Sequence, residues 1–218
     1  MTVVERLASL VVSTGPGRRV RVAIDGAGCS GKSTLADRLA VTVGPQRPVV
    51  RASIDDFMHP RSVRYRQGSE SAWGCYEDTF DLDALRAKLL DPLGPVGSGR
   101  YRTRVFDRFA DRPVSSAEQV AASDAVLLLD GVHLQRRQLS DCWDLVVHLR
   151  VPDAELLRRA RLRDVELFGD AESVEHRYRT RYLAAERLYE QQVGPVERAD
   201  VVLDNTDPVA PMVLKWPG

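Results

Sequence analysis

The sequence has few lysines, and its charges of opposite sign balance. Lys and Arg together number 31, as do Asp and Glu, but only three of the basic residues are lysines, at positions 32, 88 and 215. A net charge of zero argues against a nucleic-acid coat or a polybasic membrane binder, because both depend on a summed positive field. We therefore expect neither a nucleic-acid nor a membrane partner, while a local cationic pocket stays compatible with the composition.

Long apolar runs and paired cysteines are also missing. No window approaches the roughly 20 apolar residues that span a bilayer, and the stretch from Val3 to Val12 lacks the basic start and long apolar centre of a signal peptide. The three cysteines are scattered without a Cys-x-x-Cys pair, which indicates neither a disulfide framework nor a zinc site. The four histidines are isolated, and His148, inside an apolar run, is expected to be a hydrogen-bonded core or edge residue. We expect a protein of the reducing cytoplasm.

Short apolar runs alternate with helical patterns along the chain. A length of 218 residues is sufficient for one compact domain, and we assign residues 1–218 to a single one. Five runs are predicted as buried parallel strands: Val20 to Ile24, Val49 to Ile54, Val126 to Leu129, Leu145 to Val151 and Val201 to Leu203. Helices are predicted at Lys32 to Val43, Asp81 to Leu90, Ala154 to Phe168 and Ser173 to Gln192. This alternation predicts a doubly wound α/β fold that binds ligands at the carboxyl ends of its strands.

Two stretches break the alternation. Residues 56–80 are rich in Arg, Ser, Gly and aromatics without a clear period, and a connection of this length in a compact domain is usually functional. Residues 92–113 begin with Gly and Pro turns and continue with alternating residues at positions 100–105, which predicts a β-ribbon outside the main sheet. We interpret both as insertions on the substrate side.

A phosphate-binding motif follows the first predicted strand. The segment Gly26-Ala27-Gly28-Cys29-Ser30-Gly31-Lys32-Ser33, followed by Thr34, matches G-x-x-x-x-G-K-[ST] and opens a predicted helix, as this motif requires. Its glycines let backbone N–H groups surround a polyphosphate, the lysine reaches the β and γ phosphates, and the serine hydroxyl can ligate Mg²⁺. The sequence therefore predicts that ATP or another nucleoside triphosphate binds here with Mg²⁺.

Two acidic positions follow other predicted strands. Asp130 ends the run Val126 to Leu129 and is assigned to the metal shell; an aspartate that starts a turn with Gly131 is the alternative. Asp55 follows the second strand and is assigned as the base that accepts the proton of an acceptor hydroxyl. Asp56 is expected to be a helix cap or turn former.

Arginines are concentrated on one predicted helix. Arg158, Arg159, Arg161 and Arg163 cannot all face the same way at these spacings, so some form a solvated face. Gly169-Asp170 beyond them is a plausible hinge. We assign Arg159 and Arg163 to the stabilisation of the transferring phosphate, with a surface role as the alternative for each.

With these segments placed, the chain resembles the uridine kinase-like branch of the P-loop kinases, which includes phosphoribulokinase and bacterial pantothenate kinase. The resemblance covers about Arg19 to Asp207 and is carried by Ile24 to Leu35, Ser53 to Phe57, Arg158 to Asp164 and Glu197 to Asn205. It implies a P-loop NTPase fold, here with a five-stranded parallel sheet flanked by helices, a lid at 164–177 and a substrate-side insertion with a β-ribbon. It also implies that Asp55 is the catalytic base and that Asp130 replaces the usual glutamate.

The resemblance weakens at the acceptor site. The family's ribose-holding carboxylate falls on Cys75 in an ungapped comparison, and Asp78 or Glu77 substitutes for it after a small shift. Tyr65, Tyr76 and Tyr101, together with Trp73, are candidates to stack on a base, or else they anchor a long loop. We assign Asp55, Tyr65, Tyr76, Asp78 and Tyr101 to substrate binding.

Taken together, these features predict an ATP- and Mg²⁺-dependent kinase of a small-molecule alcohol, most simply uridine or cytidine. One alternative is a pantothenate-like or sugar-phosphate acceptor held by a cationic pocket from Arg61, Arg64, Arg66 or Arg102. Another is a nucleotide-gated regulatory protein. Because members of the resembled family are often oligomeric, a homo-oligomer is a further expectation.

Overall fold

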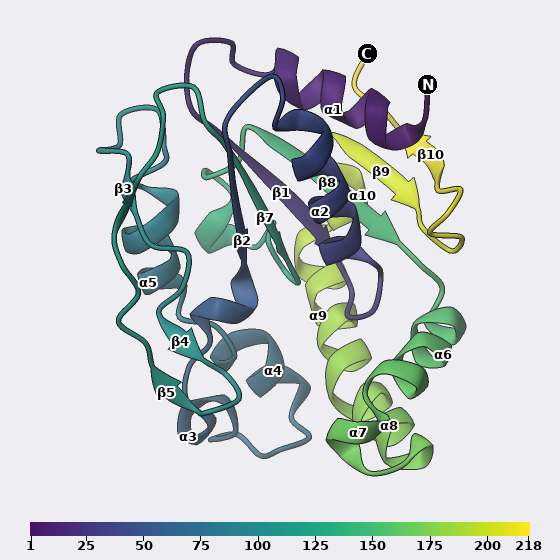
Figure 1. Ribbon diagram of the computed structural model, residues 1–218. Helices are drawn as coiled ribbons and strands as arrows, with labels where there is room; N and C mark the ends of the chain where they lie inside the picture. Colours follow the sequence, from purple (N-terminus) through teal and green to yellow (C-terminus); the bar gives the residue numbers. More distant parts are fainter.

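The computed structural model describes residues 1–218 and is built on a six-stranded sheet in the order β10-β9-β8-β1-β7-β2 (Figure 1). The parallel strands are β1 (Val20–Gly26), β2 (Val49–Ser53), β7 (Val126–Gly131), β8 (Leu145–Arg150) and β9 (Val201–Asp204). They correspond to the five predicted runs. The predicted count of five strands is nevertheless wrong, because β10 (Met212–Lys215) pairs antiparallel with β9. That edge strand is short and mostly exposed, so it has no buried apolar signature.

The two faces of the sheet pack on different layers. Side chains alternate across a strand, so Val22 and Ile24 of β1 face one layer and Ala23 faces the other. The first layer contains α1 (Val3–Ser13), begun by a Thr2–Glu5 capping box, and α2 (Lys32–Val43). Figure 1 shows both helices in front of the sheet and the long helix α9 (Leu183–Val193) behind it.

The segment between β8 and β9 is helical. It contains α6 (Asp153–Arg163), α7 (Val165–Phe168) and α8 (Ala171–Arg177), and a π-helical turn (Tyr178–Tyr182) leads into α9. Gly169, with a φ of 96°, separates α7 from α8. Gly194, with a φ of 61°, ends α9 before the short α10 (Pro195–Arg198). Two long helices are predicted here from the sequence. The structure divides the first at Asp164, between α6 and α7, and the second at the π-helical turn between α8 and α9.

The segment between β2 and β7 contains the two predicted insertions. After a 3₁₀ turn (Ile54–Phe57) come α3 (Arg61–Arg64), α4 (Ala72–Asp78) and α5 (Leu82–Leu85), the last continued by a π-helical turn (Arg86–Leu90). The ribbon consists of two short pairs: β3 (Arg100–Tyr101) with β6 (Gln119–Val120), and β4 (Phe106–Asp107) with β5 (Arg112–Pro113). A 3₁₀ turn (Arg137–Leu139) follows β7. None of the helices combines the length and apolar character that a bilayer crossing requires.

Candidate active site

The loop between β1 and α2 is held in a shape that only glycine permits at two positions. Gly26 has a φ of 140°, and a Cβ there would lie 2.6 Å from the carbonyl oxygen of Leu149. Gly31 has a φ of 92°, and its Cβ would lie 2.5 Å from the amide nitrogen of Asn205. L-residues rarely adopt such φ values. The same Asn205 amide donates to the Ser30 carbonyl at 2.7 Å, so the residue that follows β9 supports the loop from the side.

Lys32 lies over this loop. Its Nζ donates to the Ala27 carbonyl at 2.7 Å, and the side chain is almost fully buried. Burial lowers the pKa of Lys32, and four nearby carboxylates oppose this effect, in decreasing order Glu186, Asp130, Asp25 and Asp55. The ammonium therefore sits between the phosphate loop and a group of acids at the strand ends.

Two oxygen ligands suited to Mg²⁺ meet where α2 begins. Ser33 Oγ donates to Asp130 Oδ2 at 2.6 Å, and Asp130 Oδ1 lies 2.7 Å from a guanidinium nitrogen of Arg51 on β2. Hydroxyl and carboxylate oxygens are hard donors, and a Mg²⁺ ion usually takes one or two of them together with substrate phosphates. Ser33 and Asp130 therefore fit the metal that accompanies a nucleoside triphosphate. Arg51 neutralises the charge of Asp130 in this structure, and no motif in the sequence predicts that contact.

Asp55 leaves β2 beside this pair. Ser53 is in register with Asp130 across the sheet, and its hydroxyl accepts a bond of 3.4 Å from the Asp55 amide, which starts the 3₁₀ turn. The Asp55 carboxylate forms an ion pair with Arg108 from the turn between β4 and β5. Burial raises the pKa of the neighbouring Asp56, against the opposing effect of Arg104 at 3.2 Å. The ribbon thus supplies cations to both acids, a contact that sequence spacing does not reveal.

Of the four clustered arginines, Arg159 and Arg163 approach the loop. Arg159 donates to the Cys29 carbonyl at 3.2 Å and to the Asn205 carbonyl at 2.8 Å. Arg163 pairs with Asp164 at 2.7 Å and contacts the Tyr178 hydroxyl at 3.0 Å. Arg158 and Arg161 instead pair with glutamates at the surface, as expected for a solvated face.

Tyr178 joins the helical segment to the phosphate loop. Its hydroxyl donates to Asp164 Oδ2 at 2.7 Å and lies 3.2 Å from the Cys29 sulfur. Arg163 is thus connected to the loop through one tyrosine, whereas Arg159 contacts the loop backbone directly.

The predicted substrate residues other than Asp55 all have partners within the protein. Tyr65 stacks under the guanidinium of Arg181 at 4.8 Å, and Tyr76 packs against His133 at 5.2 Å. Asp78 is buried and bonded to Arg66 and to Gln67. Tyr101 lies in the hydrophobic core and donates to Gln119 at 3.1 Å. Tyr65 and Asp78 are thus already engaged within the insertion, and Tyr101 serves the packing of the ribbon.

A buried network beneath the loop is absent from the sequence-based prediction. Asp25, which directly precedes Gly26, is fully buried. It accepts bonds from Tyr189 at 2.6 Å, the Gln135 side chain at 2.9 Å, the Leu134 amide at 3.1 Å and His148 at 3.2 Å. Although burial raises the pKa of Asp25, these partners, His148 foremost, hold it well below its usual range. The expectation of a hydrogen-bonded His148 is confirmed.

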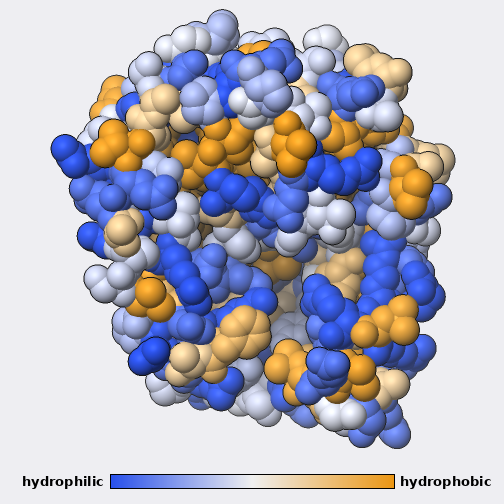
Figure 2. Space-filling view, in the orientation of Figure 1, coloured by the Kyte–Doolittle hydropathy of each residue, from blue (hydrophilic) through white to orange (hydrophobic).

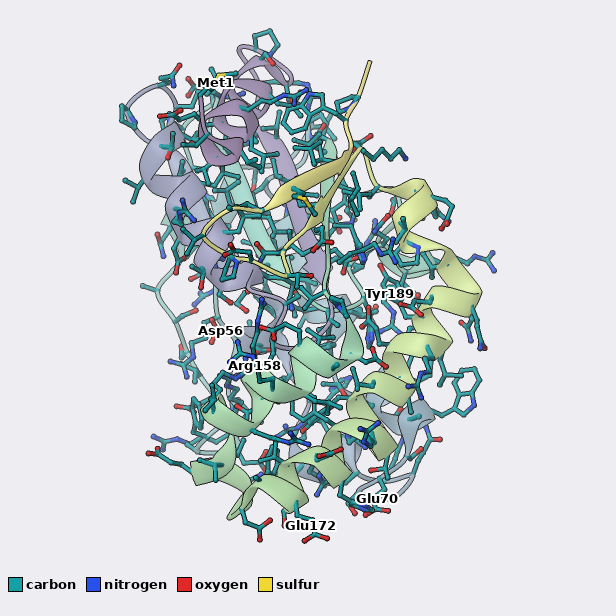
Figure 3. The ribbon with its side chains drawn as sticks, turned by 90° about the vertical axis from the view of Figure 1, so that its right-hand side faces the viewer. Met1, Asp56, Glu70, Arg158, Glu172 and Tyr189 are labelled. Carbon is teal, nitrogen blue, oxygen red and sulfur yellow. The ribbon has the colours of Figure 1, made fainter.

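The surface above these residues is hollowed. Figure 2 shows a depression in the lower half of this face, between the side that carries β4 and β5 and the side that carries α6, α7 and α8. Figure 3, turned by 90°, shows Asp56 on one side of the view and Tyr189, projecting from α9, on the other. The strand ends and the phosphate loop lie between these two sides, at the depression (Figure 1).

Comparison with known proteins agrees with this arrangement. No family model and no curated protein matches the sequence. A solved structure of a possible uridine kinase from Bacillus stearothermophilus is 25% identical with a TM-score of 0.72, over 91% of this chain and 96% of that one. A protein provisionally described as a fructose transport system kinase, from Silicibacter sp. TM1040, is 26% identical with a TM-score of 0.72, over 88% and 96%.

The chain has the fold of the uridine kinase-like P-loop kinases. D-glycerate 3-kinase from Cryptococcus neoformans shares this fold at 13% identity, with a TM-score of 0.64 over 98% of this chain and 100% of that one. In the kinase fold, the carboxyl edge of the sheet holds the loop, the metal-type oxygens and Asp55 together. Sequence reasoning missed Arg51, Arg108 and Asp25, because their partners are distant along the chain.

Proposed function

We propose that this kinase transfers the γ-phosphoryl group of ATP to a hydroxyl group of a small-molecule alcohol, with uridine or cytidine as the favoured acceptor. The observation that carries the proposal is the position of Asp55 one strand away from the Ser33–Asp130 pair. A hydrolase needs no such acid at the acceptor side, whereas a kinase needs one to orient the acceptor hydroxyl and take its proton.

Each residue of the site has a role in the proposed reaction that follows from its position. Lys32 and the loop amides hold the β and γ phosphates, and Ser33 with Asp130 holds Mg²⁺, which neutralises phosphate charge when bound. Asp55 accepts the proton from the attacking hydroxyl. Arg108 has to leave Asp55 as the acceptor enters, and the pair is sufficiently exposed for this exchange to be inexpensive.

Arg159 and Arg163 are proposed to stabilise the charge of the phosphoryl group in transit. Both already contact the loop or its neighbours, so a small movement of α6 is sufficient to redirect them. Closure of the proposed lid at 164–177 would exclude water and limit wasteful hydrolysis.

A neutral acceptor is favoured over a sugar phosphate. Of the four arginines considered for a cationic pocket, Arg64 is paired with Asp111 at 3.1 Å and Arg66 is paired with Asp78, whereas Arg61 and Arg102 form no ion pair. The charges of Arg64 and Arg66 are therefore already neutralised, which leaves two of the four arginines for an anionic group. A neutral sugar is the second candidate acceptor, in keeping with the engaged Asp78 and with the neighbour described as a fructose transport system kinase.

The deciding experiment measures ADP formation with MgATP across a panel of uridine, cytidine, other nucleosides, neutral sugars, sugar phosphates and pantothenate. The proposal expects at least tenfold stimulation by one nucleoside over the rate without acceptor. Stimulation by a sugar alone would replace the nucleoside by the second candidate. Equal ADP release with and without every alcohol would refute the kinase assignment in favour of a nucleotide-gated regulator.

A further inference from the structure

Glu186 lies on the face of α9 that is directed at the phosphate loop. Tyr189, three residues later, reaches Asp25 at 2.6 Å at the foot of that loop. Residues three apart on a helix share a face, so Glu186 is directed to the same region, one turn closer to the start of α9. Ala185 beside it packs in a cluster with Cys75 and Tyr76 of α4. Glu186 therefore lies between the phosphate loop and the insertion.

The carboxylate of Glu186 has only a weak partner. Its Oε2 lies 3.4 Å from His133 Nε2, which is longer than an ordinary N–H···O hydrogen bond. His133 Nδ1 is buried without a partner. No lysine or arginine forms an ion pair with the Glu186 carboxylate.

The other carboxylates around Lys32 have closer hydrogen-bond donors or cations that balance their negative charge. Asp130 has Ser33 and Arg51, Asp25 has four donors, and Asp55 has Arg108. Glu186 raises the pKa of Lys32 more than the other carboxylates do, yet no lysine or arginine forms an ion pair with it, and it retains 11% of its side-chain surface. A carboxylate can accept about four hydrogen bonds. A nearly buried acid with unused acceptor capacity beside a polyphosphate site is costly unless it binds a ligand.

We propose that Glu186 binds the acceptor by accepting hydrogen bonds from its hydroxyl groups, and that it selects neutral polyols over phosphorylated or carboxylated alcohols. Two carboxylate oxygens match two hydroxyls on adjacent carbons, as in a ribose or a sugar. An anionic acceptor instead meets a carboxylate that forms no ion pair with a lysine or arginine. The inference rests on the proposed function and names the substrate class for the same site.

The test compares Glu186→Gln with Glu190→Gln, a matched loss of charge at an exposed position one turn along the same helix. Initial rates are measured with MgATP, the best neutral acceptor of the panel, and its phosphorylated analogue. Glu186→Gln is expected to raise the acceptor KM at least tenfold and leave the ATP KM within twofold. It is also expected to increase the ratio of kcat/KM for the anionic acceptor to that for the neutral one. Glu190→Gln is expected to change none of these values.

The failures are distinguishable. If the wild-type protein turns over no alcohol, the proposed function fails and the inference fails with it. If the wild type is active but Glu186→Gln raises the ATP KM and leaves the acceptor KM unchanged, Glu186 only positions Lys32 and the inference alone is overturned. Should Glu186→Gln not fold, Glu186→Asp retains the charge. It is expected to raise the acceptor KM while still rejecting anionic acceptors, and loss of that rejection would contradict the assignment.

Discussion

Tyr189→Phe is the sharpest test of the network that supports the phosphate loop. The hydroxyl donates to the buried Asp25 carboxylate at 2.6 Å and accepts from the Gln135 amide at 3.0 Å. A hydrogen bond to a charged group contributes about 1.5–3 kcal/mol, and a buried N–H left unpaired costs about 1–3 kcal/mol. Their sum predicts a loss of about 3 kcal/mol or more in the free energy of unfolding. For a chain of this length that loss lowers Tm by about 6–12 °C.

The assay is urea unfolding followed by circular dichroism, with thermal unfolding alongside. Tyr182→Phe is the matched control, because the Tyr182 ring packs edge-on to Tyr178 at 5.1 Å and its hydroxyl has no hydrogen-bond partner. Its unfolding free energy is expected to stay within about 0.5 kcal/mol of the wild type. If Tyr189→Phe had the same free energy of unfolding as this control, the hydrogen bonds of Tyr189 to Asp25 and Gln135 would not stabilise the protein.

Burial lowers the pKa of His148, but the hydrogen bond and the charge interaction with Asp25 outweigh this effect. The pKa of His148 in the folded protein is therefore raised above its usual value. The stability from this pair is therefore complete below the unfolded pKa of about 6.5 and declines as pH rises through the folded value. Urea unfolding from pH 6 to 9 should show this decline in the wild type and not in His148→Asn; parallel curves would contradict it. Ser33→Ala should weaken MgATP binding about tenfold while changing metal-free ATP binding little, because one metal ligand is lost; calorimetry showing equal losses would refute the metal role. Gly26→Ala should unfold at a lower temperature than Gly28→Ala, whose Cβ meets only Tyr178 at an ordinary 3.7 Å; equal midpoints would disagree with the loop geometry.

Local sequence signals predicted the elements that depend on neighbouring residues. The helix from Lys32 to Val43 has the predicted bounds, because a phosphate-loop motif starts it and its apolar face is periodic. Four parallel strands, β1, β7, β8 and β9, were found because they are buried along almost their whole length and read as continuous apolar runs. Strand β10 was missed because an exposed edge strand carries neither signal.

Contacts between distant residues could not be read in the same way. Asp25 and Tyr189 are 164 residues apart, and nothing in their local sequence marks them as partners. The same holds for Asp55 and Arg108, which are brought together by the fold of the ribbon. Tyr101 illustrates the reverse case, since an aromatic residue beside arginines looks available for a ligand until its burial is known.

In the proposed reaction, Asp55 takes the proton of an acceptor hydroxyl during phosphoryl transfer. The most direct measurement compares Asp55→Asn and Asp56→Asn for the rate of phosphorylated product formation with MgATP and the best acceptor, alongside ATP binding by calorimetry. We predict that Asp55→Asn loses about 10²–10⁴ in kcat while binding ATP within about threefold of the wild type, and that Asp56→Asn retains most of the rate. Normal turnover by Asp55→Asn would contradict the account.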